Sequence, residues 1–138
     1  MIFLRGLPED FDSWAALGND EWSYHKVLPY FRKLETDLDM RDDMHGSAGP
    51  IPVRRHPRAS WHPFQEAFYR ACVAADFPED RDMNHPEATG VGALPLNNPH
   101  DIRMSTALAY LNPNRHRLNL TIRGNALVRR ILFDGSRA

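Results

Sequence analysis

Carboxylate side chains are dense between residues 37 and 43, where the sequence reads Asp-Leu-Asp-Met-Arg-Asp-Asp. Alternating oxygen ligands are what a calcium ion prefers, so calcium binding is the first chemistry that this stretch suggests. A calcium loop also needs a glycine at its sharp bend and a closing bidentate glutamate, and neither follows at the required place. The stretch is therefore predicted to be a solvated polar loop and not a calcium site.

Histidines supply a second candidate chemistry, because imidazole is both a common zinc ligand and a common catalytic base. His85 and Glu87 are only two residues apart in a loop, and no further ligand cluster accompanies them. His45 opens a turn that ends at Pro50. A contact to a ligand is the alternative, but the place of His45 in this turn is enough to explain a histidine at that position. We therefore predict no metal site, and we assign no catalytic residue to this chain.

The only cysteine, Cys72, excludes an internal disulfide. It lies next to Ala71 and Val73 and four residues after Phe68, so it is predicted to be a small core residue in a reducing compartment. A reactive thiol is the less favoured interpretation.

Arginines alternate with other residues near the C-terminal end, at positions where a strand could present them to phosphates. No stacking aromatic residues are interleaved with them, and the formal net charge is −1. Nucleic acid is therefore not expected as a partner, and the more favoured interpretation is a solvated or domain-facing surface. The arginines concerned are Arg115, Arg117, Arg123, Arg129 and Arg130.

Length and composition fit one modest globular core, since the 138 residues are 42% hydrophobic and 25% charged. No run approaches the roughly 20 apolar residues that a membrane helix requires. The first residues also lack the long apolar core and cleavage site of a signal peptide. A cytoplasmic location is the resulting prediction.

Two helices are expected in the first third of the chain. The first is capped by Asp10 or Asp12 and stops at Gly18, and the second begins at Ser23 with Pro29 near its first turn or at a kink. The apolar positions of the second helix are Val27, Leu28, Phe31 and Leu34, and an aromatic face of Trp22, Tyr30 and Phe31 is predicted to pack in the core.

A third helix is predicted with Ser60 as its cap and Pro63 in its first turn, ending at Phe77-Pro78. Its apolar stripe is Phe64, Phe68, Ala71 and Ala75, which we expect to face the core. A short helix is also expected from Thr106 to Leu111. Strands are predicted at residues 51–54, at 91–96, at 118–122 and at 127–133. The prolines that flank residues 51–54 favour an edge of a sheet or an exit from it.

Both ends of the chain suggest a piece of a larger protein. The strand predicted at 127–133 leads into the hairpin signal Asp134-Gly135, and only three residues remain to pair back. The opening Met1–Leu4 run is apolar from its first residue. A self-standing binding or interaction module is the alternative, and such a module is expected to close both edges of its sheet.

In their order, many short motifs resemble the glucose-methanol-choline (GMC) family of FAD-dependent oxidoreductases, its choline dehydrogenase-like members in particular. The resemblance covers nearly the whole chain. The matching stretches are Arg5-Gly6, Asp10–Trp14, Leu17–Asn19, Glu21–Tyr24, Val27–Phe31 with Glu35, His45-Gly46 with Gly49-Pro50, Arg103–Ala107, Ala109–Leu111, Leu118–Ile122, and Val128 with Ile131–Gly135.

The resemblance implies an α+β fold. It assigns residues 1–116 to part of a substrate domain built on an antiparallel sheet with helices, and residues 117–138 to strands that return to an FAD-binding domain. It also implies oxidation of an alcohol, in which FAD of the full-length parent accepts a hydride and a histidine removes the hydroxyl proton. Two cofactor contacts are implied, both through the backbone: Ile2 beside the isoalloxazine ring and Val128 at the adenine.

Other family features have no counterpart here. The phosphate-binding pattern G-x-G-x-x-G is absent, since Gly90-Val91-Gly92 is followed by Pro95 where the third glycine belongs. The family's C-terminal segment with its catalytic histidine is also absent. The chain alone is therefore expected neither to hold FAD tightly nor to turn over an alcohol, and the sequence leaves the alcohol, the electron acceptor and the oligomeric state open.

Overall fold

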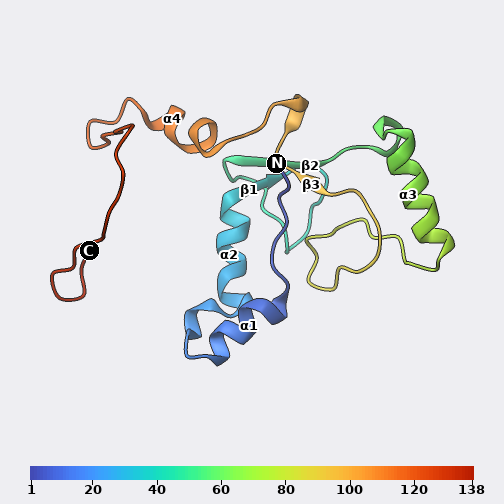
Figure 1. Cartoon of the computed structure of the whole chain (residues 1–138), viewed down its shortest axis with the longest axis horizontal. Coiled ribbons are helices and arrows are strands. Elements are labelled where there is room, and N and C mark those ends of the chain that lie inside the picture. The colour runs from blue at the N-terminus through green and yellow to red at the C-terminus, as the bar shows by residue number, and fades with distance from the viewer.

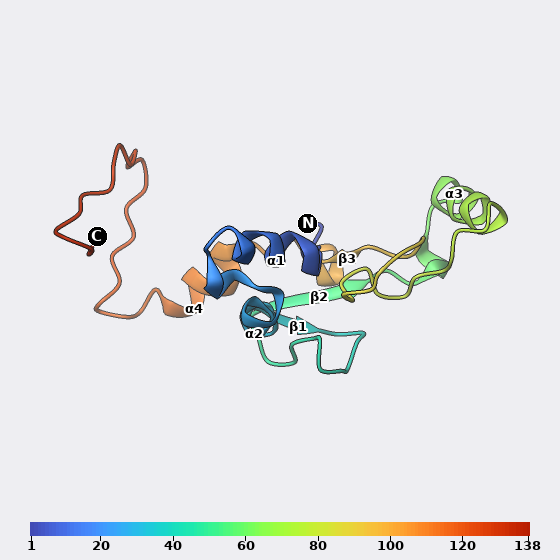
Figure 2. The same ribbon diagram turned by 90° about the horizontal axis from the view of Figure 1, so that it is seen from below.

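The computed structural model describes residues 1–138 as an elongated molecule around a small central sheet (Figure 1). The helices α1 and α2 lie on one side of the sheet, α3 lies at one end of the molecule, and the C-terminal segment extends from the other end. The view from below shows the same arrangement (Figure 2). Only 14 residues are buried, so the core is small and most of it lies around the sheet.

The first two helices form where the sequence predicts them. Helix α1 spans Pro8–Ala16 and ends before Gly18, whose φ of 95° few other residues adopt. Helix α2 spans Tyr24–Leu34, after a 3-10 turn at Asp20–Trp22. Asp12 accepts a hydrogen bond from the Tyr24 backbone N–H at 2.9 Å, so it caps α2 and not its own helix. This contact ties the two helices together.

The aromatic core between these helices differs in part from the prediction. Phe11 and Tyr24 are buried, and the Phe11 ring meets the edge of Phe31 at 5.5 Å between ring centroids. Tyr30 is 68% exposed, however, and Trp22 is about half exposed. Neighbouring positions on a helix point about 100° apart, and with Phe31 facing α1 the side chain of Tyr30 turns toward solvent.

The sheet is mixed, in the order β1-β2-β3. Strands β1 (Glu35–Asp37) and β2 (Ile51–Arg55) are parallel, and β2 and β3 (Pro95–Leu96) are antiparallel. The α+β class is therefore confirmed, whereas the expected antiparallel arrangement holds only for the second pair. The strand predicted at 51–54 is confirmed as β2, but a place at the edge of the sheet was wrong, because β2 is central. Its Pro52 is tolerated because β3 pairs only with the far end of β2.

Helix α3 spans Pro63–Ala74, close to the predicted range, but it begins after His62 and not at Ser60. The Gln65 side chain accepts a hydrogen bond from the His62 N–H at 2.9 Å. The predicted core stripe was wrong: Phe64 and Phe68 are 83% and 61% exposed. The helix lies away from the sheet (Figure 1). The residue that α3 buries is Tyr69, which packs against Trp61 and lies on another face of the helix than Phe64 and Phe68.

The rest of the chain contains one more helical stretch and then little regular structure. A π-helical turn, Ala107–Leu111, continues into α4 (Asn112–Asn114), so the helix extends beyond the predicted end at Leu111. From Arg117 onward no residue joins a strand. Asp134 pairs with Arg137 around a tight turn at Gly135, as the hairpin signal indicates. None of the helices combines the length and the apolar character needed to cross a bilayer.

Candidate functional site

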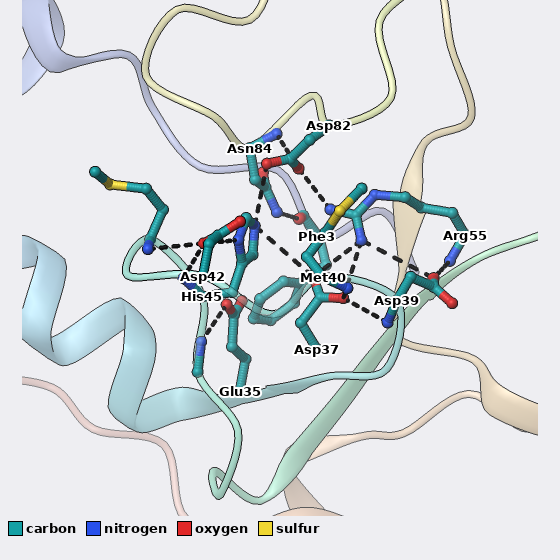
Figure 3. Close-up of polar contacts among 12 residues, drawn as sticks. Phe3, Glu35, Asp37, Asp39, Met40, Asp42, His45, Arg55, Asp82 and Asn84 are labelled. Atoms are coloured by element: carbon teal, nitrogen blue, oxygen red, sulfur yellow. Dashed lines mark hydrogen bonds and ion pairs between the residues drawn. The ribbon is translucent and has the colours of Figure 1, made fainter.

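A cluster of charged and polar side chains, most of them buried, lies beside the sheet, where separate parts of the chain meet (Figure 3). Two of its carboxylates come from β1 and its central guanidinium comes from β2. The ionic cluster, as we call it below, consists of Arg5, Glu35, Asp37, Asp42, His45, Arg55, Asp82 and Asn84.

Arg55 joins two carboxylates at the centre of the cluster. Its Nη1 lies 3.0 and 2.9 Å from the two oxygens of Asp37, and its Nη2 lies 2.6 Å from Asp82 Oδ1. Burial lowers the pKa of Arg55, but the hydrogen bonds and charges of Asp37 and Asp82 outweigh it and raise the pKa. Asp37 is fully buried. The prediction of a solvated loop was therefore wrong for its first residue, Asp37, which is buried and pairs with Arg55 on the neighbouring strand.

A second buried pair joins the N-terminal segment to the start of β1. Arg5 Nη2 lies 2.5 Å from Glu35 Oε1, and Arg5 Nη1 donates to the Met44 carbonyl at 2.8 Å. The same Glu35 oxygen accepts a hydrogen bond from the Gly46 N–H at 3.0 Å. A side chain at Gly46 would overlap the backbone carbonyls of Arg32 and Glu35. The glycine therefore allows the 42–46 turn to close over β1.

His45 lies between carboxylates from three parts of the chain and is only 4% exposed. Its Nδ1 is 2.8 Å from Asp42 Oδ1. Its Nε2 is 3.3 Å from Asp82 Oδ2 and 3.8 Å from Asp37 Oδ2, within ion-pair range of both but without a well-aligned hydrogen bond to either. The turn placement predicted for His45 is thus correct, but it does not account for a buried imidazole.

The same residues include a possible ligand set for a metal ion. Glu35, Asp37 and His45 each offer one ligand atom, and these atoms lie within 4.8 Å of one another. The guanidinium groups of Arg5 and Arg55 already pair with the two carboxylates. A divalent cation would have to share those carboxylates with two fixed positive charges, which repel it. We therefore assign the cluster as a network of ion pairs.

Asn84 fastens the N-terminal segment to the cluster. Its Nδ2 donates to the Phe3 carbonyl at 3.0 Å, and its Oδ1 accepts from the Arg5 N–H at 3.0 Å. On the other side, the Phe3 N–H donates to the Pro95 carbonyl at 2.9 Å. The segment therefore runs antiparallel to β3, and Ile2 lies opposite Leu96.

Ile2, one of the two predicted cofactor contacts, has backbone groups that are free to bind. In this pairing the neighbours of Ile2 make the hydrogen bonds to the β3 side, so the Ile2 N–H and C=O point the other way. Neither group has a partner in the chain, and the side chain is 61% exposed. These features fit a contact to FAD through the backbone, and the assignment stays a prediction.

Val128, the other predicted contact, is 79% exposed in the segment after Arg117. Its backbone is also unpaired, and neither Val128 nor Ile2 lines the apolar groove described below. Nothing in these positions tests the adenine contact, so it too stays a prediction.

A separate apolar groove of about 990 Å³ lies between α3 and the loop that leads to β3. Phe64, Phe68 and Phe77 line it, and so does Cys72, which is half-buried on the wall and not enclosed in a core as predicted. The groove contains none of the residues of the ionic cluster.

Sequence reasoning missed the ionic cluster, although β2 carried a signal for it. Val53 and Arg55 are two residues apart, so they lie on the same face of the strand. Val53 is fully buried, and an arginine on the same face must then find acidic partners. The identity of those partners, Asp37 and Asp82, could not be read from this spacing.

Comparison with known proteins agrees with the resemblance found in the sequence. The sequence model described as "GMC oxidoreductase" matches residues 1–138. An uncharacterized GMC-type oxidoreductase of Rhodococcus erythropolis is 45% identical over 99% of this chain and 27% of its own length. An oxygen-dependent choline dehydrogenase of Ectopseudomonas mendocina is 43% identical over the whole chain and 25% of its own length.

Solved structures share the fold. Pyridoxine 4-oxidase from Mesorbium loti superposes with a TM-score of 0.81 at 32% identity, over 88% of this chain and 24% of the oxidase. An FAD-dependent oxidoreductase from Chaetomium thermophilum superposes with a TM-score of 0.68 at 26% identity, over 80% of this chain and 21% of that protein. The chain spans about a quarter of the length of the curated relatives that it matches. The family match over every residue leads to one conclusion: this chain belongs to the GMC oxidoreductase family.

Proposed function

We propose that the chain is part of an FAD-dependent oxidoreductase that oxidises a CH–OH donor. The observation that carries the proposal is the family match over residues 1–138, together with identities of 43–45% to full-length relatives. Choline and pyridoxine, which appear in the names of two similar proteins, both carry a CH2–OH group. A primary alcohol is therefore the substrate class that we propose.

In this proposal the chain contributes structure next to the cofactor. FAD, bound mainly by other parts of the parent protein, supplies the hydride acceptor. Residues 1–116 form part of the substrate domain, and the backbone of Ile2 lines one side of the flavin. Residues 117–138 return to the FAD-binding domain, where Val128 contacts the adenine. A cytoplasmic location is part of the same proposal.

The proposal is tested on the protein that contains this chain. We expect the purified protein to show visible flavin absorbance and to release FAD on denaturation. Choline or pyridoxine, added without oxygen, should bleach the flavin band. Glycine betaine, the matched control, resembles choline but has no CH–OH group and should leave the band unchanged. A protein without flavin, or one that no primary alcohol reduces, would contradict the proposal.

The isolated chain tests whether the cofactor site lies mainly outside these 138 residues. We expect the isolated 138 residues to retain no FAD after gel filtration, because they lack the glycine-rich turn that binds the pyrophosphate. Stoichiometric FAD in that sample would show that the cofactor site lies within this chain.

A further inference from the structure

The surroundings of His45 determine its protonation state. Carboxylate oxygens accept hydrogen bonds and cannot donate them, and such oxygens face both ring nitrogens, from Asp42 at Nδ1 and from Asp82 and Asp37 at Nε2 (Figure 3). A neutral imidazole would direct one lone pair at a carboxylate. Because His45 is 4% exposed, water has little access to relieve that repulsion.

The balance of charge around His45 points the same way. The carboxylates nearest to it are Asp37 and Glu35 from β1, Asp42 from the preceding loop, and Asp82 from the segment before β3. Only two buried guanidinium groups, those of Arg5 and Arg55, compensate these four negative charges. Asp39 and Arg41 of the same loop are exposed. A positive imidazole reduces the excess of negative charge.

The pKa values agree with this geometry. Burial lowers the pKa of His45, but the nearby carboxylates of Asp82 and Asp42 outweigh burial and raise the pKa above its ordinary value. Burial raises the pKa of Asp82, but the nearby His45, the hydrogen bond from the Asn84 N–H and the positive charge of Arg55 bring it down to about 2.

A chain of contacts runs from His45 to the N-terminal segment. Asp82 faces His45 with Oδ2 and accepts a hydrogen bond from the Asn84 N–H at 3.1 Å with Oδ1. The Asn84 side chain in turn holds the Phe3 carbonyl and the Arg5 N–H. Without its positive charge, His45 would repel Asp82 and weaken the support of Asn84.

We propose that His45 is an imidazolium that positions the Met1–Arg5 segment through Asp82 and Asn84. Its consequence for the flavin rests on the proposed function, because only that function places Ile2 beside the ring. The protonation state and the positioning of the segment do not depend on FAD.

The first experiment measures the imidazole directly. In protein labelled with ¹⁵N-histidine, NMR should show both ring nitrogens of His45 protonated at pH 7, with titration only at a higher pH. Asp42→Asn removes one carboxylate at a partly exposed position and should move the titration of His45 to lower pH. A His45 with one bare nitrogen at pH 7 would overturn the proposal. A change of the Nε2 signal on addition of Zn²⁺ would overturn it in favour of a metal ligand.

The second experiment measures the positioning. His45→Gln should make hydrogen exchange of the Arg5 amide faster by on the order of tenfold, because its partner Asn84 loses support. Asn84→Ala should have the same effect on Arg5 and leave the His45 signals protonated, which keeps the test valid if His45→Gln does not fold. His116→Gln, on an exposed histidine, is the control and should change neither. Unchanged Arg5 exchange in both the His45 and Asn84 variants would overturn the positioning role.

A third measurement separates this inference from the proposed function. In protein that retains FAD, raising the pH through the titration of His45 should shift the visible flavin band, and His45→Gln should abolish that dependence. A flavin band that stays insensitive while the NMR and exchange results hold would contradict only the placement of Ile2. Protein without FAD would contradict the proposed function, and the first two experiments would still decide the state and role of His45.

Discussion

The ionic cluster and the segment from Arg117 to Ala138 differ in which side chains they bury: the cluster buries charged residues, and the segment leaves apolar residues exposed. In the cluster, Glu35 and Asp37 are fully buried, and each pairs with a guanidinium. In the segment, Leu127 and Phe133 are 88% and 68% exposed. The difference shows that burial in this chain follows the supply of partners and not residue type. Charges are enclosed where several parts of the chain meet, and apolar side chains stay outside where the chain offers no matching surface.

The largest expected effect comes from breaking the cluster at Arg55. Arg55→Met leaves Asp37 and Asp82 buried without their shared guanidinium, so we expect the free energy of unfolding to fall by about 3–5 kcal/mol. Urea denaturation followed by circular dichroism measures it. Arg58→Met removes an arginine that pairs with Glu66 at the surface of α3 and should cost far less. Equal losses for the two variants would refute the contrast between buried and exposed ion pairs.

A glycine in each region gives a second, sterically defined comparison. Gly46→Ala places a methyl group against the backbone carbonyls of Arg32 and Glu35, and we expect a loss of about 3 kcal/mol from this overpacking. Gly124→Ala lies in the C-terminal segment with no atom within 4 Å of the added carbon. It should leave the urea midpoint almost unchanged. A midpoint that moves equally in both variants would mean that the 42–46 turn can shift away from β1.

Acid should weaken the cluster by a smaller amount. The pKa of Asp82 is depressed from 3.8 to about 2, so its ion pairs stabilise the fold fully above pH 4 and are lost as the pH falls through 2. The expected loss is about 2 kcal/mol. The pairing of Asp82 with His45 should also weaken in base. The pKa of His45 is raised, so its contribution to stability is present below pH 6.5 and is lost as the pH rises through the pKa of His45 in the folded protein. Urea midpoints across this range measure both limbs, and Asp82→Asn should flatten the acid limb.

The smallest effect is expected in the C-terminal segment. Leu127→Ala in the isolated chain should change the free energy of unfolding by less than about 0.5 kcal/mol, because the side chain is almost fully exposed. Val53→Ala, at a fully buried position, is the matched comparison and should cost more. In the parent protein, Leu127→Ala should become destabilising if residues 117–138 pair with the FAD-binding domain. An equally small effect there would refute that assignment.

Local signals predicted the helices well. Gly18 ends α1, Ser23 precedes α2 and Pro63 begins α3, and each acts through backbone geometry within a few residues. The same signals misjudged which helical face is covered. Phe64 and Phe68 form an apolar stripe in the sequence, yet α3 lies away from the sheet and leaves them exposed.

Strand prediction succeeded for β2 and, at residues 95–96 alone, for β3, whereas β1 was not predicted. Residues 51–55 form β2 because β1 and β3 lie on either side of it. Residues 127–133 have a similar apolar character and form no strand, since the hydrogen bonds of a strand must come from a neighbour. Apolar character alone therefore indicates a capacity to pair, and the neighbour decides whether pairing occurs.

The sequence by itself determined the family, the three main helices and the position of β2, because these depend on ordered motifs and on contacts between residues close in the chain. Only the tertiary structure decided which charges are buried and how they are compensated. Arg5 meets Glu35, Arg55 meets Asp37 and Asp82, and His45 lies between carboxylates, through approaches across tens of residues. An isolated acidic or basic residue looks the same in sequence whether it faces water or a distant partner, and the fold alone removes the water.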